Sequence, residues 1–238
     1  MTKIVSLVKT RPGTSPEAFR EYWRGPFLNS ILDLEGLTKS VVKITHNHVL
    51  PLVIRDDFPI SPWAGFSEMW FDERGDADGF LNHPALPGVL ASHSLLVAEV
   101  LHLHCTELPT WDVGVDSPPL KMMAFFLPSR NMTRAQSQDY WTNKHVAIAS
   151  ALNNPKRFCP RYVQNHTLLD YHNATPEYDF AGAPELWFYS REAALELFSE
   201  TDNLVELQAD EAKFSNRAST VALMTDEQLV YSRITGCI

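Results

Sequence analysis

The sequence lacks the features that mark several large classes of protein. Its three cysteines lie far apart among 238 residues and show no CxxC spacing, which is typical of free thiols in a reducing compartment. The net charge is −9 and no cluster of lysine or arginine stands out, so binding to nucleic acid or to an anionic membrane is disfavoured. We find no signal peptide and no apolar run of about 18 residues. We therefore expect a cytoplasmic protein that does not bind membranes.

Glycine is scarce too, with ten residues in the whole chain. None of them belongs to a phosphate-binding loop, to the sharp turn that presents a catalytic serine, or to a dinucleotide-binding fingerprint. Nucleotide-dependent chemistry and this class of serine hydrolase are therefore disfavoured. Hydrophobic residues, in contrast, make up 45% of the chain and aromatic residues 11%, which indicates either a large core or an apolar cavity.

What the chain does contain is an internal repeat. Three motifs recur in one order at offsets of 117 or 118 residues: Tyr22-Trp23 as Tyr140-Trp141, Asn47-His48 as Asn165-His166, and Glu68–Phe71 as Glu185–Phe188. Such a repeat predicts two similar units that complete each other's core. We place the first unit at residues 1–106 and the second at 120–238. Residues 107–119, rich in Pro, Asp and Gly, are predicted to be a linker.

Each half shows the same order of predicted elements. In both, a buried strand is followed by a helix, two strands, a second helix and a last strand. Ser15 before Pro16, and Thr133 with Gln136 three residues on, predict where the first helices begin. The predicted strands are 3–9, 40–50, 66–71 and 97–105, then 121–127, 157–168, 185–189 and 228–234, and the predicted second helices are 77–94 and 191–214. The order βαββαβ is ferredoxin-like, so we expect an α+β fold in which two such repeats pack sheet to sheet.

The chain resembles the EthD family of the dimeric α+β barrel superfamily. The resemblance is carried by YWTNKH at 140–145, RYVQNH at 161–166, ELWF at 185–188 and a helix that ends in ADEAKF, with weaker counterparts in the first half. It implies a tandem member, with both repeats forming one intramolecular dimeric α+β barrel. The first half departs from the pattern, because it has Phe27 where the second half has His145.

The resemblance also implies chemistry without a cofactor on a hydrophobic, oxygenated ring or polyketide-like molecule. We expect a lyase or cyclase, of the decarboxylase or dehydratase type, that moves protons inside an apolar cavity. Two alternatives stay open: a non-catalytic protein that binds a hydrophobic metabolite, and a monooxygenase that needs no cofactor. We expect no partner other than the small molecule, and leave open whether the chain forms a homodimer.

His145 is the first candidate for a catalytic residue, because an imidazole titrates near neutral pH and lies one helical turn beyond Trp141. We expect Glu185 or His166 to orient it or to activate water. Glu185 interrupts an apolar strand, and a buried carboxylate can serve acid–base chemistry. The expected substrate-binding residues are His48, Glu68, Tyr140, Trp141 and Trp187. The alternatives are structural: a helix-end histidine, ion-paired glutamates and core aromatics.

Two His-x-His pairs raise the question of a metal. His46 with His48, and His102 with His104, each place two imidazoles on one strand face, a spacing that metal sites use. No carboxylate motif accompanies either pair, and the second half has no counterpart of the latter pair. We therefore predict no metal and no cofactor.

Overall fold

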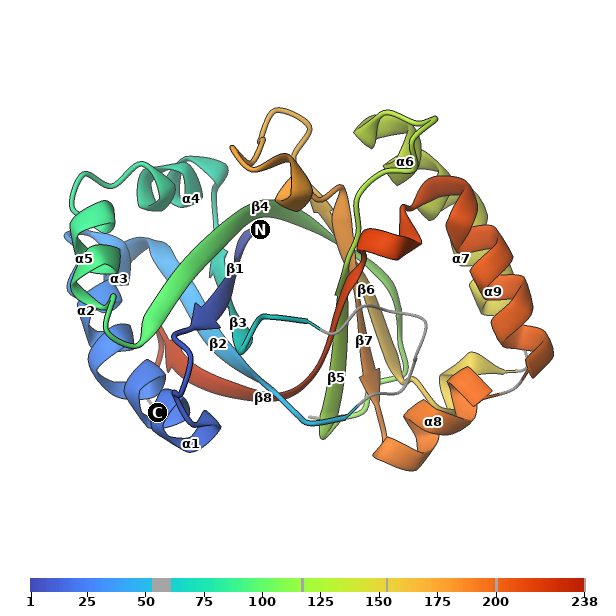
Figure 1. Ribbon diagram of the computed structural model, residues 1–238, viewed down its shortest axis with the longest axis horizontal. Coiled ribbons are helices and arrows are strands. Elements are labelled where there is room, and N and C mark those ends of the chain that lie inside the picture. Colours follow the sequence, from blue (N-terminus) through green and yellow to red (C-terminus); the bar gives the residue numbers. More distant parts are fainter. Residues whose placement is uncertain (53–60, 117, 153, 200, 238) are drawn as a thin grey trace. The chain divides into compact units, whose positions relative to one another are not determined.

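The structure is a computed structural model, which describes residues 1–52, 61–116, 118–152, 154–199 and 201–237 (Figure 1). Two compact units make up the chain. Unit 1 comprises Met1–Val49, Pro62–Thr106 and Glu227–Ile238, and unit 2 comprises Leu50–Ser61 and Glu107–Asp226. Among the described residues, no helix has both the length and the apolar character needed to cross a membrane.

Unit 1 is built on a sheet with strand order β4–β1–β3–β2–β8–β9. Only the part of β4 up to Thr106 and the part of β8 from Glu227 onward belong to unit 1. The neighbours β4, β1, β3 and β2 are antiparallel. The strand bounds are β1 (Thr2–Thr10), β2 (Val41–Val49), β3 (Gly65–Phe71), β4 (Val97–Asp112), β8 (Val221–Ser232) and β9 (Gly236–Cys237).

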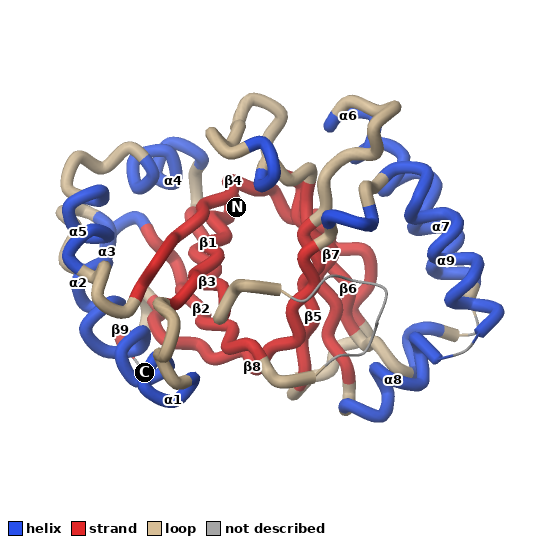
Figure 2. The backbone as a smooth tube through the Cα atoms, in the orientation of Figure 1, coloured by secondary structure: helices blue, strands red, loops and turns tan. Residues whose placement is uncertain are grey.

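The helices of unit 1 cover one face of this sheet (Figure 2). They are α1 (Pro16–Tyr22), the π-helix η1 (Trp23–Phe27), α2 (Leu28–Leu32), α3 (Leu37–Ser40), α4 (Arg74–Leu81) and α5 (Leu86–Ser92). The core between helices and sheet includes Phe19, Trp23 and Ile44. Val230 and Tyr231, from the end of the chain, belong to the same core.

Unit 2 repeats this plan with a sheet of strand order β8–β5–β7–β6–β4. Its own strands are β5 (Leu120–Phe125), β6 (Arg161–Thr167) and β7 (Gly182–Phe188). Its helices are α6 (Arg134–Tyr140), the π-helix η2 (Trp141–His145), α7 (Val146–Ala151), α8 (Arg191–Ser199) and α9 (Thr201–Phe214), with short 3₁₀ turns η3 (Pro155–Arg157), η4 (Pro176–Tyr178) and η5 (Arg217–Ser219). The predicted α+β class is therefore confirmed, whereas the sheet-to-sheet packing of the two repeats stays a prediction.

The structure differs from the predicted boundaries at β4, at β8 and in the second helix of each unit. Residues 107–112 of the predicted linker are strand, because β4 continues to Asp112 and Arg161 Nε donates to the Asp112 carboxylate over 2.7 Å. β8 begins at Val221, well before the predicted residue 228. The second helix of unit 1 is two helices, because Pro84 and Pro87 interrupt the backbone hydrogen bonding of a continuous one. In unit 2 the corresponding segment is likewise divided, into α8 and α9.

Candidate functional site

Unit 2 contains a cavity of about 100 Å³ between its sheet and its helices. Aromatic rings form much of its wall, namely Trp111, Phe126, Trp141, Phe198 and Phe214. Four side chains with ionisable groups also line it: His145, Tyr162, Glu211 and Arg217. A mostly apolar pocket with a few convergent polar groups is the usual form of a small-molecule site.

Local sequence explains how Trp141 and His145 reach this cavity. Thr133 and Gln136 form a capping box at the start of α6, which fixes where the helix begins. After Tyr140 the helix widens into the π-helix Trp141–His145, and both of its end residues line the cavity. Trp141 packs against the backbone at Gly182, where an added Cβ would come within 3.0 Å of the indole. Only glycine leaves room for the ring in this place.

His145 is hydrogen-bonded to a carboxylate that the sequence interpretation missed. Its Nδ1 lies 2.7 Å from Asp210 Oδ2, and both side chains are buried. Since an ionised carboxylate only accepts hydrogen bonds, Nδ1 of a neutral His145 carries the hydrogen and Nε2 carries the lone pair. The pair therefore holds the imidazole in the tautomer that a general base needs.

Asp210 is itself held in place by two further donors. Tyr140 Oη donates to Oδ1 over 2.8 Å, and Lys213 Nζ lies 3.1 Å from the same oxygen. Burial alone would raise the pKa of Asp210, but the hydrogen bonds from His145, Tyr140 and Lys213 outweigh it and keep the pKa below its ordinary value. Asp210 is therefore a carboxylate at neutral pH and stabilises a positive charge on His145.

Tyr140 and Trp141 thus have different positions. Trp141 lines the cavity, as a substrate-binding residue would. Tyr140 is not among the cavity-lining residues, and its hydroxyl group is directed at Asp210. We therefore describe Tyr140 as a residue that positions Asp210.

Glu185 projects from the opposite face of β7. Its neighbours Pro184 and Leu186 line the cavity, and since strand residues alternate between faces, Glu185 points the other way. There it forms a fully buried ion pair with Lys121 and accepts a hydrogen bond of 2.9 Å from Asn165 Nδ2. Trp187 shares that face, with Lys121 Nζ 4.8 Å from its ring centre. The structure therefore does not bring Glu185 or Trp187 to His145.

His166 lies beside the cavity wall but does not line it. Its ring stacks on Trp141, with centroids 4.8 Å apart and planes inclined by 8°. Its Nε2 lies 3.1 Å from Gln164 Oε1 and 3.3 Å from Thr142 Oγ1. These contacts support the orientation of Trp141 rather than that of His145.

Unit 1 has a corresponding cavity between its helices and its sheet, but this cavity is smaller and different side chains line it. Its volume is about 20 Å³, enough for about one water molecule. Phe27 lines it in place of His145, and Ile44 stands where unit 2 has Tyr162. Tyr22 Oη lies 2.5 Å from Nδ1 of His93, a residue that precedes Asp210 by 117 positions. Unit 1 therefore keeps the tyrosine and replaces the carboxylate by an imidazole.

The predicted residues His48 and Glu68 both belong to unit 1. His48 packs edge-on against Trp23 at a centroid distance of 5.1 Å. Glu68 is fully buried, 2.6 Å from Lys3 Nζ, and accepts hydrogen bonds from Asn47 and Thr45. Neither residue lies in the unit that contains His145.

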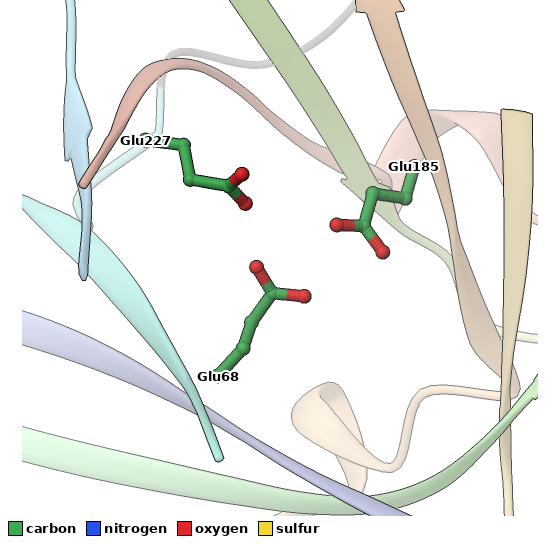
Figure 3. Close-up of side chains that lie close together, drawn as sticks. All are labelled: Glu68, Glu185 and Glu227. Atoms are coloured by element: carbon green, nitrogen blue, oxygen red, sulfur yellow. The ribbon is translucent and has the colours of Figure 1, made fainter. Parts of the chain in front are cut away.

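Several of the side chains that could hold a metal ion have partners within the described residues. Figure 3 shows the carboxylates of three glutamates. Glu68 on β3 and Glu227 on β8 belong to unit 1, and their carboxylate oxygens lie within 4.8 Å of each other. Glu185 on β7 belongs to unit 2. The Lys3 ammonium group already neutralises Glu68. His102 bonds Ser6 and His104 bonds Thr2, so each imidazole of that His-x-His pair has its own partner.

Four histidines whose pKa is lowered by burial predict how stability depends on pH. Burial lowers the pKa of His48, His102 and His166 from 6.5 to about 4, and that of His46 well below 6.5. The unfolded chain therefore binds more protons between pH 6.5 and 4, and the free energy of unfolding should fall as the pH falls through this range. In His166→Gln, urea unfolding at pH 5 should take up about one proton fewer. An unchanged proton uptake would contradict this, and His83→Gln, at a partly exposed histidine, serves as the control.

The comparisons with known proteins agree with this fold. The EthD domain family model matches residues 129–218, which confirms the resemblance to that family predicted from the second half of the sequence. An anthrone oxidase-like protein shares 8% identity at a TM-score of 0.65, covering 100% of this chain and 96% of its own. A candidate monooxygenase from Fusobacterium nucleatum shares 5% sequence identity at a TM-score of 0.54, and the match covers 100% of this chain and 95% of its own.

A mutant chlorite dismutase from Candidatus Nitrospira defluvii, solved with cyanide, shares 12% identity at a TM-score of 0.50, covering 95% of this chain and 90% of its own. At such identities the likeness is one of fold alone. No curated protein matches the sequence.

Proposed function

We propose that the chain is a cofactor-independent enzyme in which His145, positioned by Asp210, moves protons on a hydrophobic, oxygenated small molecule bound in the cavity of unit 2. The single observation that carries this is the buried 2.7 Å contact between His145 and Asp210 at the edge of an apolar cavity. A carboxylate that fixes the tautomer of an imidazole and stabilises its cation is a common arrangement in general acid–base catalysis.

The aromatic wall favours a substrate with a flat ring. Trp111, Trp141 and Phe214 offer ring faces or edges to the cavity and leave few polar groups to compete for the substrate. Exclusion of water by such walls strengthens the electrostatic interaction between the histidine and the developing charge. A lyase or cyclase of the decarboxylase or dehydratase type fits this site, and the tandem barrel expected from the sequence remains its proposed scaffold.

A cofactor-free monooxygenase is the second candidate, favoured by the fold shared with the anthrone oxidase-like protein and the candidate monooxygenase. It would use the same base to form a carbanion, but would consume molecular oxygen. A non-catalytic binding protein is the third, since unit 1 lacks the His145 imidazole.

A screen of aromatic β-keto acids and polyketide-like ring compounds tests the proposal. Products are followed by mass spectrometry and oxygen by an electrode, with wild type and His145→Gln in parallel. We expect a product that depends on His145 and forms without oxygen uptake. Product formation that requires oxygen would identify the monooxygenase, and binding without any product would favour the binding protein.

A further inference from the structure

We infer that Tyr162 is the hydrogen-bond donor that binds the substrate's carbonyl or enolate oxygen in the cavity of unit 2, which makes the substrate a carbonyl compound with an acidic C–H bond. This inference rests on the proposed function, because the Tyr162 hydroxyl group would bind the same substrate from which His145 removes a proton. Tyr162 is on β6 and its side chain is buried within the cavity wall.

The hydrogen bonds around Tyr162 determine where its hydrogen can go. The indole Nε1 of Trp141, which can only donate, lies 2.8 Å from Tyr162 Oη. Gln164 Nε2 lies 3.4 Å from the same oxygen. Both neighbours therefore donate to the phenol oxygen and occupy its acceptor positions.

The orientation of the Gln164 amide group is fixed independently. Its nitrogen also faces the backbone oxygen of Trp141 at 3.4 Å, and a carbonyl oxygen can only accept. Its Oε1 meanwhile accepts from Thr142 Oγ1 at 2.9 Å. If the amide group were flipped, its oxygen would face the backbone oxygen of Trp141, and both atoms are acceptors. The nitrogen is therefore the atom that points to Tyr162.

The phenol hydrogen of Tyr162 is consequently directed elsewhere. Within the described part of the chain, no acceptor for it is found, and the residue lines the cavity. Two donors to the oxygen polarise the O–H bond and make it a better donor. Burial raises the pKa of Tyr162, so the hydroxyl group keeps its hydrogen at every pH at which the protein would work.

His145 and Tyr162 together define a reaction class. His145 Nε2 takes a proton from the carbon next to the carbonyl group, and the C–H electron pair forms the carbon–carbon double bond of the enolate. The π pair of the C=O bond moves onto oxygen, and the Tyr162 hydroxyl group donates a hydrogen bond to this enolate oxygen. The proton on His145 is then returned to carbon or to a leaving group. No oxidant or reductant enters this step. Unit 1 lacks both groups, since Phe27 and Ile44 stand in their places.

Acetophenone and cumene test the donor directly, because they have nearly the same shape and only acetophenone carries a carbonyl oxygen. Quenching of tryptophan fluorescence measures their binding, since Trp111 and Trp141 line the cavity. We expect Tyr162→Phe to weaken acetophenone binding by about tenfold and to leave cumene binding unchanged. Tyr189→Phe, which changes an exposed tyrosine of the same unit, is the matched control.

The infrared carbonyl stretch of bound ¹³C=O acetophenone provides the second measurement. A hydrogen bond to the oxygen should shift it to lower wavenumber in wild type, and the shift should disappear in Tyr162→Phe. An equal stretch in both proteins, or equal binding of acetophenone and cumene by wild type, would overturn the inference. Neither measurement needs turnover. A failed substrate screen, which would contradict the proposed function, is therefore distinguishable from a failure of Tyr162 to act as the donor.

Discussion

Replacing His145 with glutamine is expected to lower turnover by a factor on the order of 10²–10⁴, the usual contribution of a positioned general base. Glutamine has a similar length and can still bond Asp210, but its amide group takes up no proton near neutral pH. Asp210→Asn should lower turnover as well, because an amide oxygen accepts the Nδ1 hydrogen without stabilising the imidazolium charge. The measurement is kcat and KM on the substrate found in the screen.

The control for this loss is a histidine of the same unit outside the cavity. His172→Gln changes an exposed imidazole that bonds Asp179, and it should leave kcat within about twofold of wild type. Thermal unfolding of each variant shows whether the fold is intact. A His145→Gln enzyme that folds and keeps wild-type turnover would remove His145 from the mechanism.

Replacing Glu185 with leucine is expected to lower the free energy of unfolding by about 3–5 kcal/mol, the cost of removing one partner of a buried ion pair. Glu185 and Lys121 are both fully buried, so the change leaves the Lys121 ammonium group in the interior without this carboxylate. The Asn165 amide group also loses an acceptor. Urea unfolding at pH 7 measures the effect.

The double variant Lys121→Met with Glu185→Leu separates charge from packing. Because it removes both charges and keeps apolar volume, most of the lost stability should return. Glu196→Leu, at an exposed carboxylate 3.7 Å from Arg157, should change stability by less than about 0.5 kcal/mol. A double variant as unstable as Glu185→Leu would show that the charge on Lys121 is not the cause.

The sequence was sufficient for features that depend on short-range chemistry. Ser15 and Thr133 accept hydrogen bonds from the backbone at the predicted helix starts. The face shared by Gln164 and His166, opposite Asn165, follows from the two-residue repeat of a strand, and the structure shows it. These features need only neighbours in the chain, and the sequence displays those neighbours.

Features that depend on distant contacts were not predictable in the same way. Asp210 is 65 residues from His145, and only the packing of α9 against η2 brings them together. A signal was present, however, in the ADEAKF segment, where Asp210 and Lys213 are three residues apart on one helix. Glu185 was assigned to the wrong partner, since its buried position was apparent from the strand pattern but the face that it occupies was not.

The unit boundaries have a consequence for genetic dissection of the protein. Unit 1 takes the end of β8, from Glu227, and all of β9 from the C-terminal part of the chain, although the rest of it ends at Thr106. Val230 and Tyr231 belong to its apolar core, so a gene fragment that stops after residue 106 encodes an incomplete fold. A gene that encodes unit 1 alone would need the codons for the C-terminal strands joined to those for the first half. Unit 1 is therefore discontinuous along the chain, and no single uninterrupted gene fragment encodes it alone.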